Sequence, residues 1–171
     1  MKNLADLPAT KEYMKEFANQ VFSPIFQGQS TAMITVPNFG SNSFVKYILG
    51  YSENIDKELK SKLATYRFLE LNLRGIEEVN SIWEQLSLQI GSKSSTKEKV
   101  IKELSNIQKD RLVIIINGID EVFSLDIVKS TIAAIYSSIS SLLTIGLYYG
   151  ETKNEYMNFL TTNLRINSFT Y

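Results

Sequence analysis

The sequence predicts an α/β protein, a three-layer αβα sandwich around a five-stranded parallel sheet. Segments with the apolar spacing of helices alternate along the chain with short apolar runs typical of strands. Strands that alternate with helices form right-handed crossovers, which produce a parallel sheet with helices on both faces. The 171 residues are enough for one domain with a substantial core, so we expect a single domain over residues 1–171.

The first half of the chain supplies one helix, two strands and the start of a second helix. Apolar side chains recur at helical spacing over residues 11–22, and we expect Pro24 and the Gln-Gly-Gln-Ser segment after it to end this helix. Residues 31–36 read as a short buried strand, and a helix is expected to begin at Ser41. Leucines alternate with polar residues in 66–73, which predicts a half-buried or edge strand.

The second half begins with two helices and contains the most apolar strand of the chain. The apolar stripes of the two helices are Ile76, Val79, Ile82, Leu86 and Ile90 in the first, and Val100, Ile101, Leu104 and Ile107 in the second. Residues 111–120 include an unbroken aliphatic run, which is typical of a central parallel strand covered on both faces. A helix over 126–140, a strand over 142–149, a helix over 153–163 and a strand around 165–171 complete the expected elements.

The composition excludes several kinds of chemistry. The chain has no cysteine and no histidine, which excludes disulfides, zinc enzymes and serine–histidine hydrolases. Lys plus Arg and Asp plus Glu number 18 each, so the net charge does not indicate nucleic acid or an anionic membrane as a partner. The N-terminus has no apolar core of signal-peptide length, and the longest apolar stretches are far short of a membrane span, so we expect a soluble cytoplasmic protein. Chemistry would depend on carboxylates, hydroxyls, lysines, backbone amides or a hard cation.

Two loops follow predicted strands, at the end of an open α/β sheet where ligands bind. Residues 36–43 precede a helix whose first N–H groups and dipole could hold a phosphate, with Ser43 placed to reach a metal ion or a phosphate oxygen. The second loop contains Asn117, Asp120 and Glu121, and carboxylates at such a position can hold Mg²⁺ or orient a water. Taken alone, the acidic pair is better explained as the start and cap of the next helix.

In this order and spacing, the two loops resemble the Walker A and Walker B regions of P-loop ATPases. The closest likeness is to the AAA+ and STAND groups, including the origin-recognition and NACHT-type ATPases. Their strand, G-P-x-x-x-G-K-[ST] and helix are similar to residues 34–49, which read ITVPNFGSNSFVKYIL. Their Walker B often reads LVIIIDGLDE, and residues 112–121 read LVIIINGIDE. The resemblance covers most of the chain and implies a sheet order of 5-1-4-3-2, with no helical lid within the 171 residues.

The resemblance also implies a site for ATP and Mg²⁺. It assigns the nucleotide-binding loop to Pro37, Asn38, Phe39, Gly40, Ser41, Asn42, Ser43 and Phe44. It places Ser43 and Asn117 at the metal ion, and it gives the catalytic roles to Asp120 and Glu121.

Four positions depart from the family's pattern, and each departure weakens the site. Val36 and Ser41 fall where glycines are usual, Asn42 falls at the Walker lysine, and Asn117 falls at the metal-directing aspartate. Asn42 cannot supply the charge of the lysine, and losing one charge-assisted contact costs about 1.5–3 kcal/mol. We therefore expect nucleotide binding with weak or absent hydrolysis.

Two other readings remain open at the level of sequence. In the first, the chain is a pseudo-ATPase that serves as an interaction or scaffold subunit, in a homo- or hetero-oligomer with related ATPase subunits. In the second, it is a small α/β domain of receiver or Toprim type. That type needs carboxylates at its early strand ends, and residues 33–38 contain none.

Overall fold

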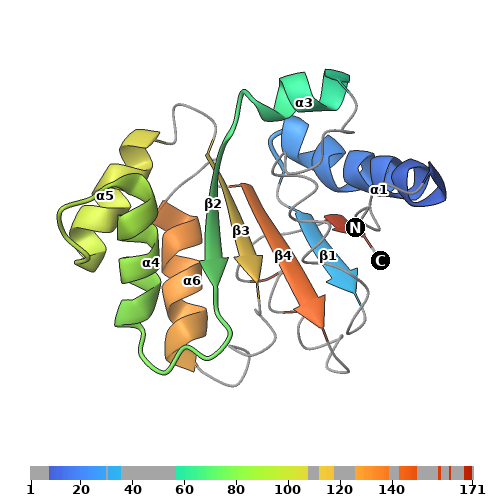
Figure 1. Ribbon diagram of the computed structural model, residues 1–171. Helices are drawn as coiled ribbons and strands as arrows, with labels where there is room; N and C mark the ends of the chain where they lie inside the picture. Colours follow the sequence, from blue (N-terminus) through green and yellow to red (C-terminus); the bar gives the residue numbers. More distant parts are fainter. Residues whose placement is uncertain are drawn as a thin grey trace, which may run out of the picture.

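The computed structural model describes residues 8–29, 31–35, 57–107, 112–117, 126–138, 143–149 and 168–170, together with Asn158 and Thr162. Its five strands are β1 (Thr31–Thr35), β2 (Arg67–Asn72), β3 (Leu112–Asn117), β4 (Leu143–Tyr149) and β5 (Ser168–Thr170). They form one sheet in the order β2-β3-β4-β1-β5, and every neighbouring pair is parallel (Figure 1). Read from the other edge, this order is 5-1-4-3-2. The α/β class predicted from the sequence is confirmed.

Five helices are described around this sheet. They are α1 (Pro8–Phe26), α3 (Lys57–Leu63), α4 (Asn80–Ile90), α5 (Lys97–Ile107) and α6 (Asp126–Ser138). The expected helices with stripes from Ile76 and from Val100 correspond to α4 and α5, although Ile76 and Val79 precede the first turn of α4 and pack against the core from there. The helices expected from Ser41 and over 153–163 lie outside the described residues, apart from Asn158 and Thr162.

The first helix runs through Pro24 and ends at Phe26, directly before the Gln-Gly-Gln-Ser segment that was expected to end it; the proline itself does not end the helix. Proline removes one N–H group and crowds the preceding turn, but the helix continues for only two residues beyond it. The helix then ends in a Schellman motif. The N–H of Gln29 donates to the carbonyl of Pro24 at 2.9 Å, and the N–H of Gly28 donates to that of Ile25 at 2.9 Å. Gly28 has a φ of 77°, which a residue with a side chain rarely adopts, so the glycine ends the helix.

The short helix α3 was not expected from the sequence. It has only seven residues, and its apolar signal is limited to Leu59 and Leu63, which lie one turn apart and are both buried. Glu58 and Lys62 form an ion pair of 2.9 Å on its exposed side. Two apolar residues in seven are too few for a periodic pattern, which explains why this helix escapes sequence analysis.

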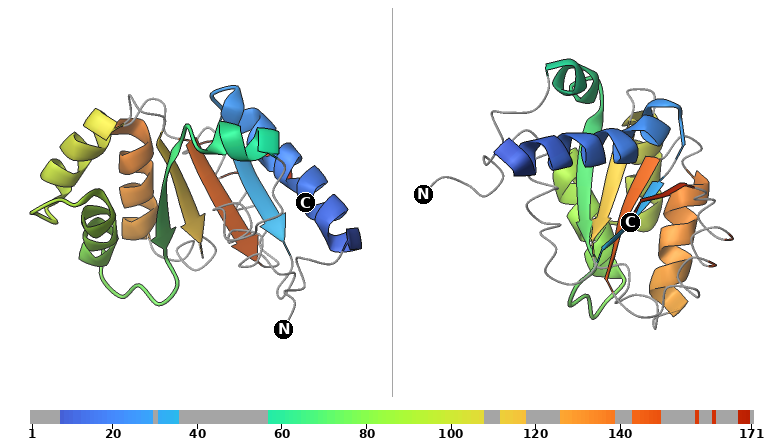
Figure 2. Two further views of the ribbon diagram at one scale, coloured as in Figure 1. Left: turned by 45° about the horizontal axis from the view of Figure 1, so that its top comes forward. Right: turned by 90° about the vertical axis from the view of Figure 1, so that its right-hand side faces the viewer.

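Helices cover both faces of the sheet, as the two views of Figure 2 show. On one face, α4, α5 and α6 pack over the leucines of β2 and alternate residues of β3. The buried members of this cluster are Leu69, Leu71, Leu73, Ile82, Trp83, Leu86, Val100, Leu104, Leu112, Ile114, Ile116, Val128, Ile132 and Ile135. On the other face, Phe22 of α1 meets Phe68 of β2 edge to face, with ring centroids 6.3 Å apart. Residues 112–116 of β3 are all buried, which confirms a central strand covered on both sides.

Candidate functional site

The register of the sheet brings the carboxyl ends of β1 and β3 to the same end of the sheet. Leu147 of β4 pairs with Met33 of β1 on one side and with Asn117 of β3 on the other. The arrowheads of β1, β3 and β4 point the same way in Figure 1, so the segments after Thr35 and Asn117 leave from one edge. Because one strand separates β1 from β3, the two strands run about 10 Å apart.

The two strands do not end at the same level. Asn117 is the last residue of β3, whereas β1 continues two residues beyond its partner on that level, to Thr35 opposite Tyr149 of β4. Two residues of a parallel strand advance about 6.6 Å. The loop that begins at residue 36 therefore starts farther out than the loop that begins at residue 118.

Of the residues assigned to the site from the sequence, the structure describes only Asn117, at the end of β3. Residues 37–44, Asp120 and Glu121 lie outside the described residues, so their grouping around a nucleotide stays a prediction. The strand positions that precede both loops are nevertheless fixed by the sheet register, and these positions are compatible with a shared site.

One polar residue at this edge was not singled out from the sequence. Asn72 ends β2 and lies opposite Asn117 in the register. Its Oδ1 accepts the N–H of Arg74 at 3.2 Å, and its backbone N–H and C=O are bonded to the side chain of Gln85. Asn72 therefore shapes the turn after β2. Its place at the end of a strand was the only sequence signal for it.

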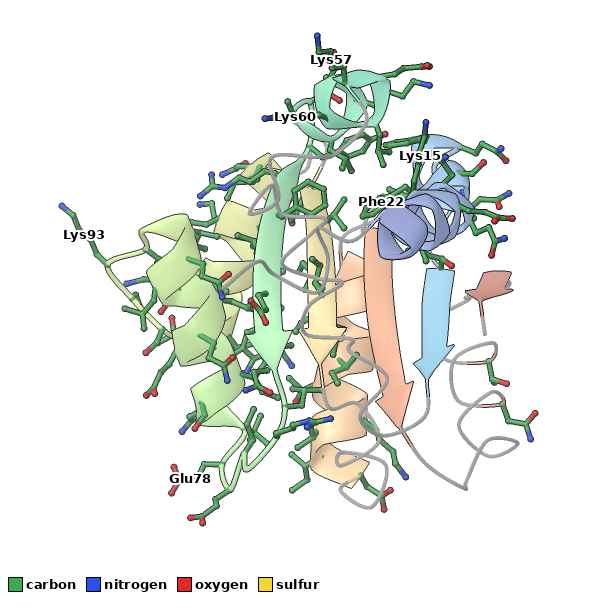
Figure 3. The ribbon with its side chains drawn as sticks, turned by 45° about the vertical axis from the view of Figure 1, so that its right-hand side comes forward. Lys15, Phe22, Lys57, Lys60, Glu78 and Lys93 are labelled. Carbon is green, nitrogen blue, oxygen red and sulfur yellow. The ribbon has the colours of Figure 1, made fainter. Side chains whose placement is uncertain are left out.

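A pocket in the described part of the chain lies at the other end of the sheet. It has a volume of about 320 Å³ between α1 and α3, lined by Asn19, Ser23, Phe26, Glu58, Leu59 and Lys62. The ammonium of Lys62 stands 5.9 Å from the ring centroid of Phe26. In Figure 3, α3 with Lys57 and Lys60 is at one end of the sheet and Glu78, which follows β2, is at the opposite end. The pocket is thus remote from the loops after β1 and β3.

Within the described ranges, no three acidic residues come together in a group that could hold a metal ion. None of the helices in that part of the chain is both long enough and apolar enough to cross a membrane.

Comparison with known proteins identifies similar solved structures. No family model matches the chain, and no curated protein matches it. The structure of the ORC1 protein of Aeropyrum pernix in complex with DNA is similar with a TM-score of 0.69 at 15% identity, over 96% of this chain and 45% of that one. The ORC2 protein of the same organism is similar in its ADPNP-ADP complexes, with a TM-score of 0.60 at 10% identity, over 96% of this chain and 48% of that one. Its ADP form has a TM-score of 0.61 at 13% identity, over 93% and 46%.

These likenesses show the fold. The chain spans about half the length of the ORC proteins that it matches. At identities of 10–15%, the agreement lies in the path of the backbone and not in the sequence. The chain therefore has the α/β fold of these ORC proteins.

Proposed function

We propose that this chain is a nucleotide-binding domain of the AAA+ P-loop type, with a degenerate site that binds ATP with Mg²⁺ and hydrolyses it weakly or not at all. The register of β1, β4 and β3 is the observation that supports this proposal most, because Thr35 and Asn117, which precede the two loops, end their strands at the same end of the sheet. The ORC2 structures of the same fold hold ADPNP and ADP, which supports a nucleotide as the ligand.

Several residues at the two loops suit a hard cation and a polyphosphate. Backbone N–H groups of residues 36–43 would bind phosphate oxygens, and the hydroxyl of Ser43 and the side-chain carbonyl of Asn117 are oxygen ligands of the kind Mg²⁺ accepts. Asp120 and Glu121 would supply negative charge and orient a water. When bound, Mg²⁺ neutralises charge on the phosphates.

The same residues leave the site weak for catalysis. Asn42 brings no positive charge to the phosphates, and Asn117 brings no negative charge to the metal ion. Hydrolysis depends on electrostatic stabilisation of the transferred phosphoryl group, so both losses reduce the rate more than they reduce binding. Because hydrolysis is weakened more than binding, we expect the site to bind nucleotide and hydrolyse it slowly or not at all.

A scaffold role is the second candidate. Two large apolar side chains are exposed in the described part of the chain, Leu88 on α4 at 80% and Ile127 on α6 at 68%. A contiguous patch of exposed apolar side chains marks an interaction surface, and these two side chains are candidates for such a patch. In this role the chain would assemble with related ATPase subunits and bind no nucleotide itself. For either role, we also propose that the protein is located in the cytoplasm and that residues 1–171 form a single domain.

Thermal unfolding with and without nucleotide separates the two candidates. At a nucleotide concentration ten times the Kd, binding stabilises the folded state by about 1.4 kcal/mol. In a chain of this size, about 1 kcal/mol shifts the Tm by about 2–4 °C. We expect ATP with Mg²⁺ to raise the Tm by about 3–6 °C and Ser43→Ala to reduce this rise.

The variants make each result informative. A rise in wild type that is lost in Ser43→Ala supports nucleotide binding in the first loop. A rise only in Asn42→Lys indicates a site that has lost its nucleotide and favours the scaffold role. No rise in either protein at millimolar nucleotide contradicts the nucleotide-binding proposal.

A further inference from the structure

The outer edge of the sheet at β2 is closed by side chains of α4. β2 is the outermost strand and pairs with β3 on one side only. Backbone groups of alternate residues in a strand point to opposite sides, so half of them face away from the neighbouring strand. An edge of this kind is a template on which another chain can add a strand. In this protein the outward groups of Glu70 and Asn72 are already bonded, to two glutamine side chains.

Each glutamine forms two hydrogen bonds with one residue of β2. Gln85 accepts the N–H of Asn72 through Oε1 at 2.9 Å, and its Nε2 donates to the C=O of Asn72 at 2.9 Å. Gln89 accepts the N–H of Glu70 at 2.7 Å and donates to the C=O of Glu70 at 2.5 Å. A primary amide presents a donor and an acceptor side by side, as a peptide group does. The two side chains thus satisfy four backbone groups that a sixth strand would otherwise satisfy.

The spacing of the two glutamines matches the spacing of the strand. Residues four apart in a helix lie on one side and differ by about 6.0 Å along the axis. Residues two apart in a parallel strand differ by about 6.6 Å. Nε2 of Gln89 also donates to the C=O of Gln85 at 3.1 Å, and the guanidinium of Arg67 donates to the C=O of Gln89 at 3.2 Å. These contacts hold the end of α4 against the strand, and the buried Leu86 of the same helix packs in the core cluster.

We propose that Gln85 and Gln89 act in place of a sixth strand and keep the β2 edge from pairing with the β2 edge of a second copy of this chain. A second copy presents the same outward groups of Glu70 and Asn72, so two copies can satisfy each other about a twofold axis. In the wild-type protein the two glutamine amides already occupy these groups, so two copies cannot pair through them. The proposal uses no residue of the candidate nucleotide site and is independent of the proposed function.

Site-resolved hydrogen exchange tests the bonding of the edge with single variants. Gln85→Ala is expected to speed exchange at the Asn72 amide, and Gln89→Ala at the Glu70 amide, each by about tenfold, the effect of one ordinary hydrogen bond. The Leu71 amide faces β3 and is expected to stay protected in both variants. Gln20→Ala, at an exposed glutamine of α1, is the matched control and should change none of the three. Unchanged exchange at Glu70 and Asn72 would overturn the proposal.

The double variant Gln85→Ala/Gln89→Ala tests the exclusion of a second copy. Sedimentation velocity over a series of protein concentrations should show dimers at concentrations at least about tenfold lower than in the wild type and in Gln20→Ala. A double variant that is as monomeric as the wild type throughout the series refutes the exclusion. If the double variant fails to fold, the same series on the two single variants decides, with each expected to dimerise more readily than the wild type.

Discussion

The packing of α4 on the sheet leads to a prediction in which two leucines of one helix behave in opposite ways. Leu86 has 0% exposure and contacts the cluster formed by α4, α5, α6, β2 and β3. Leu86→Ala removes a buried methine and two methyl groups beside strands that hydrogen bonds hold in place, so the cavity can collapse only in part. Buried Leu→Ala changes cost about 2.7–5 kcal/mol. For a chain of this size, the expected fall in Tm is about 5–20 °C.

The matched control lies two residues along the same helix. Leu88 is 80% exposed, so Leu88→Ala should change the free energy of unfolding by less than about 0.5 kcal/mol and the Tm by less than about 2 °C. Both variants remove the same atoms and carry the same helix propensity, so burial is the only difference between them. Thermal unfolding followed by circular dichroism measures the two shifts. Equal shifts, or a larger one for Leu88→Ala, would refute the packing of α4 described here.

Three further predictions concern single positions. Trp83 is the only tryptophan and is 3% exposed, so native fluorescence should be blue-shifted and poorly quenched by iodide; ready quenching in the folded protein would contradict its burial. Gly91 has a φ of 73° and a Cβ there meets nothing within 4 Å, so Gly91→Ala should cost about 1–2 kcal/mol through backbone strain alone in chemical denaturation, and Gly28→Ala should cost the same; no cost would contradict both conformations. The Glu58–Lys62 pair has side chains that are 74% and 56% exposed, so a double-mutant cycle should give a coupling below about 1 kcal/mol, and a larger coupling would refute its placement on the surface.

The strands were predictable from the sequence because each has a one-dimensional signal. The alternation of Leu69 and Leu71 with polar residues identified an edge strand, and the unbroken run in 112–116 identified a strand covered on both faces. Both patterns show directly whether one face or both faces of the strand are buried. For the same reason the buried stripe of α4, with Ile82 and Leu86, could be read in advance.

The remaining features depend on contacts between distant residues. The hydrogen bonds from Gln85 and Gln89 to β2 join residues 13 and 19 positions apart, and no periodicity reveals which backbone a surface amide meets. The candidate site was predicted from two loops that follow strands and from their resemblance to Walker motifs, and the structure describes Asn117 alone among its predicted residues.

Calorimetric titration of ATP with Mg²⁺ into the wild type and Asn42→Lys tests the nucleotide-binding proposal most directly. The account predicts one weak site per chain in the wild type. A lysine at position 42 restores one charge-assisted contact of about 1.5–3 kcal/mol, so Asn42→Lys should bind about 10–100-fold more tightly at the same stoichiometry. Absence of binding heat in both proteins at millimolar ATP would contradict the proposal that residues 36–43 form a phosphate loop.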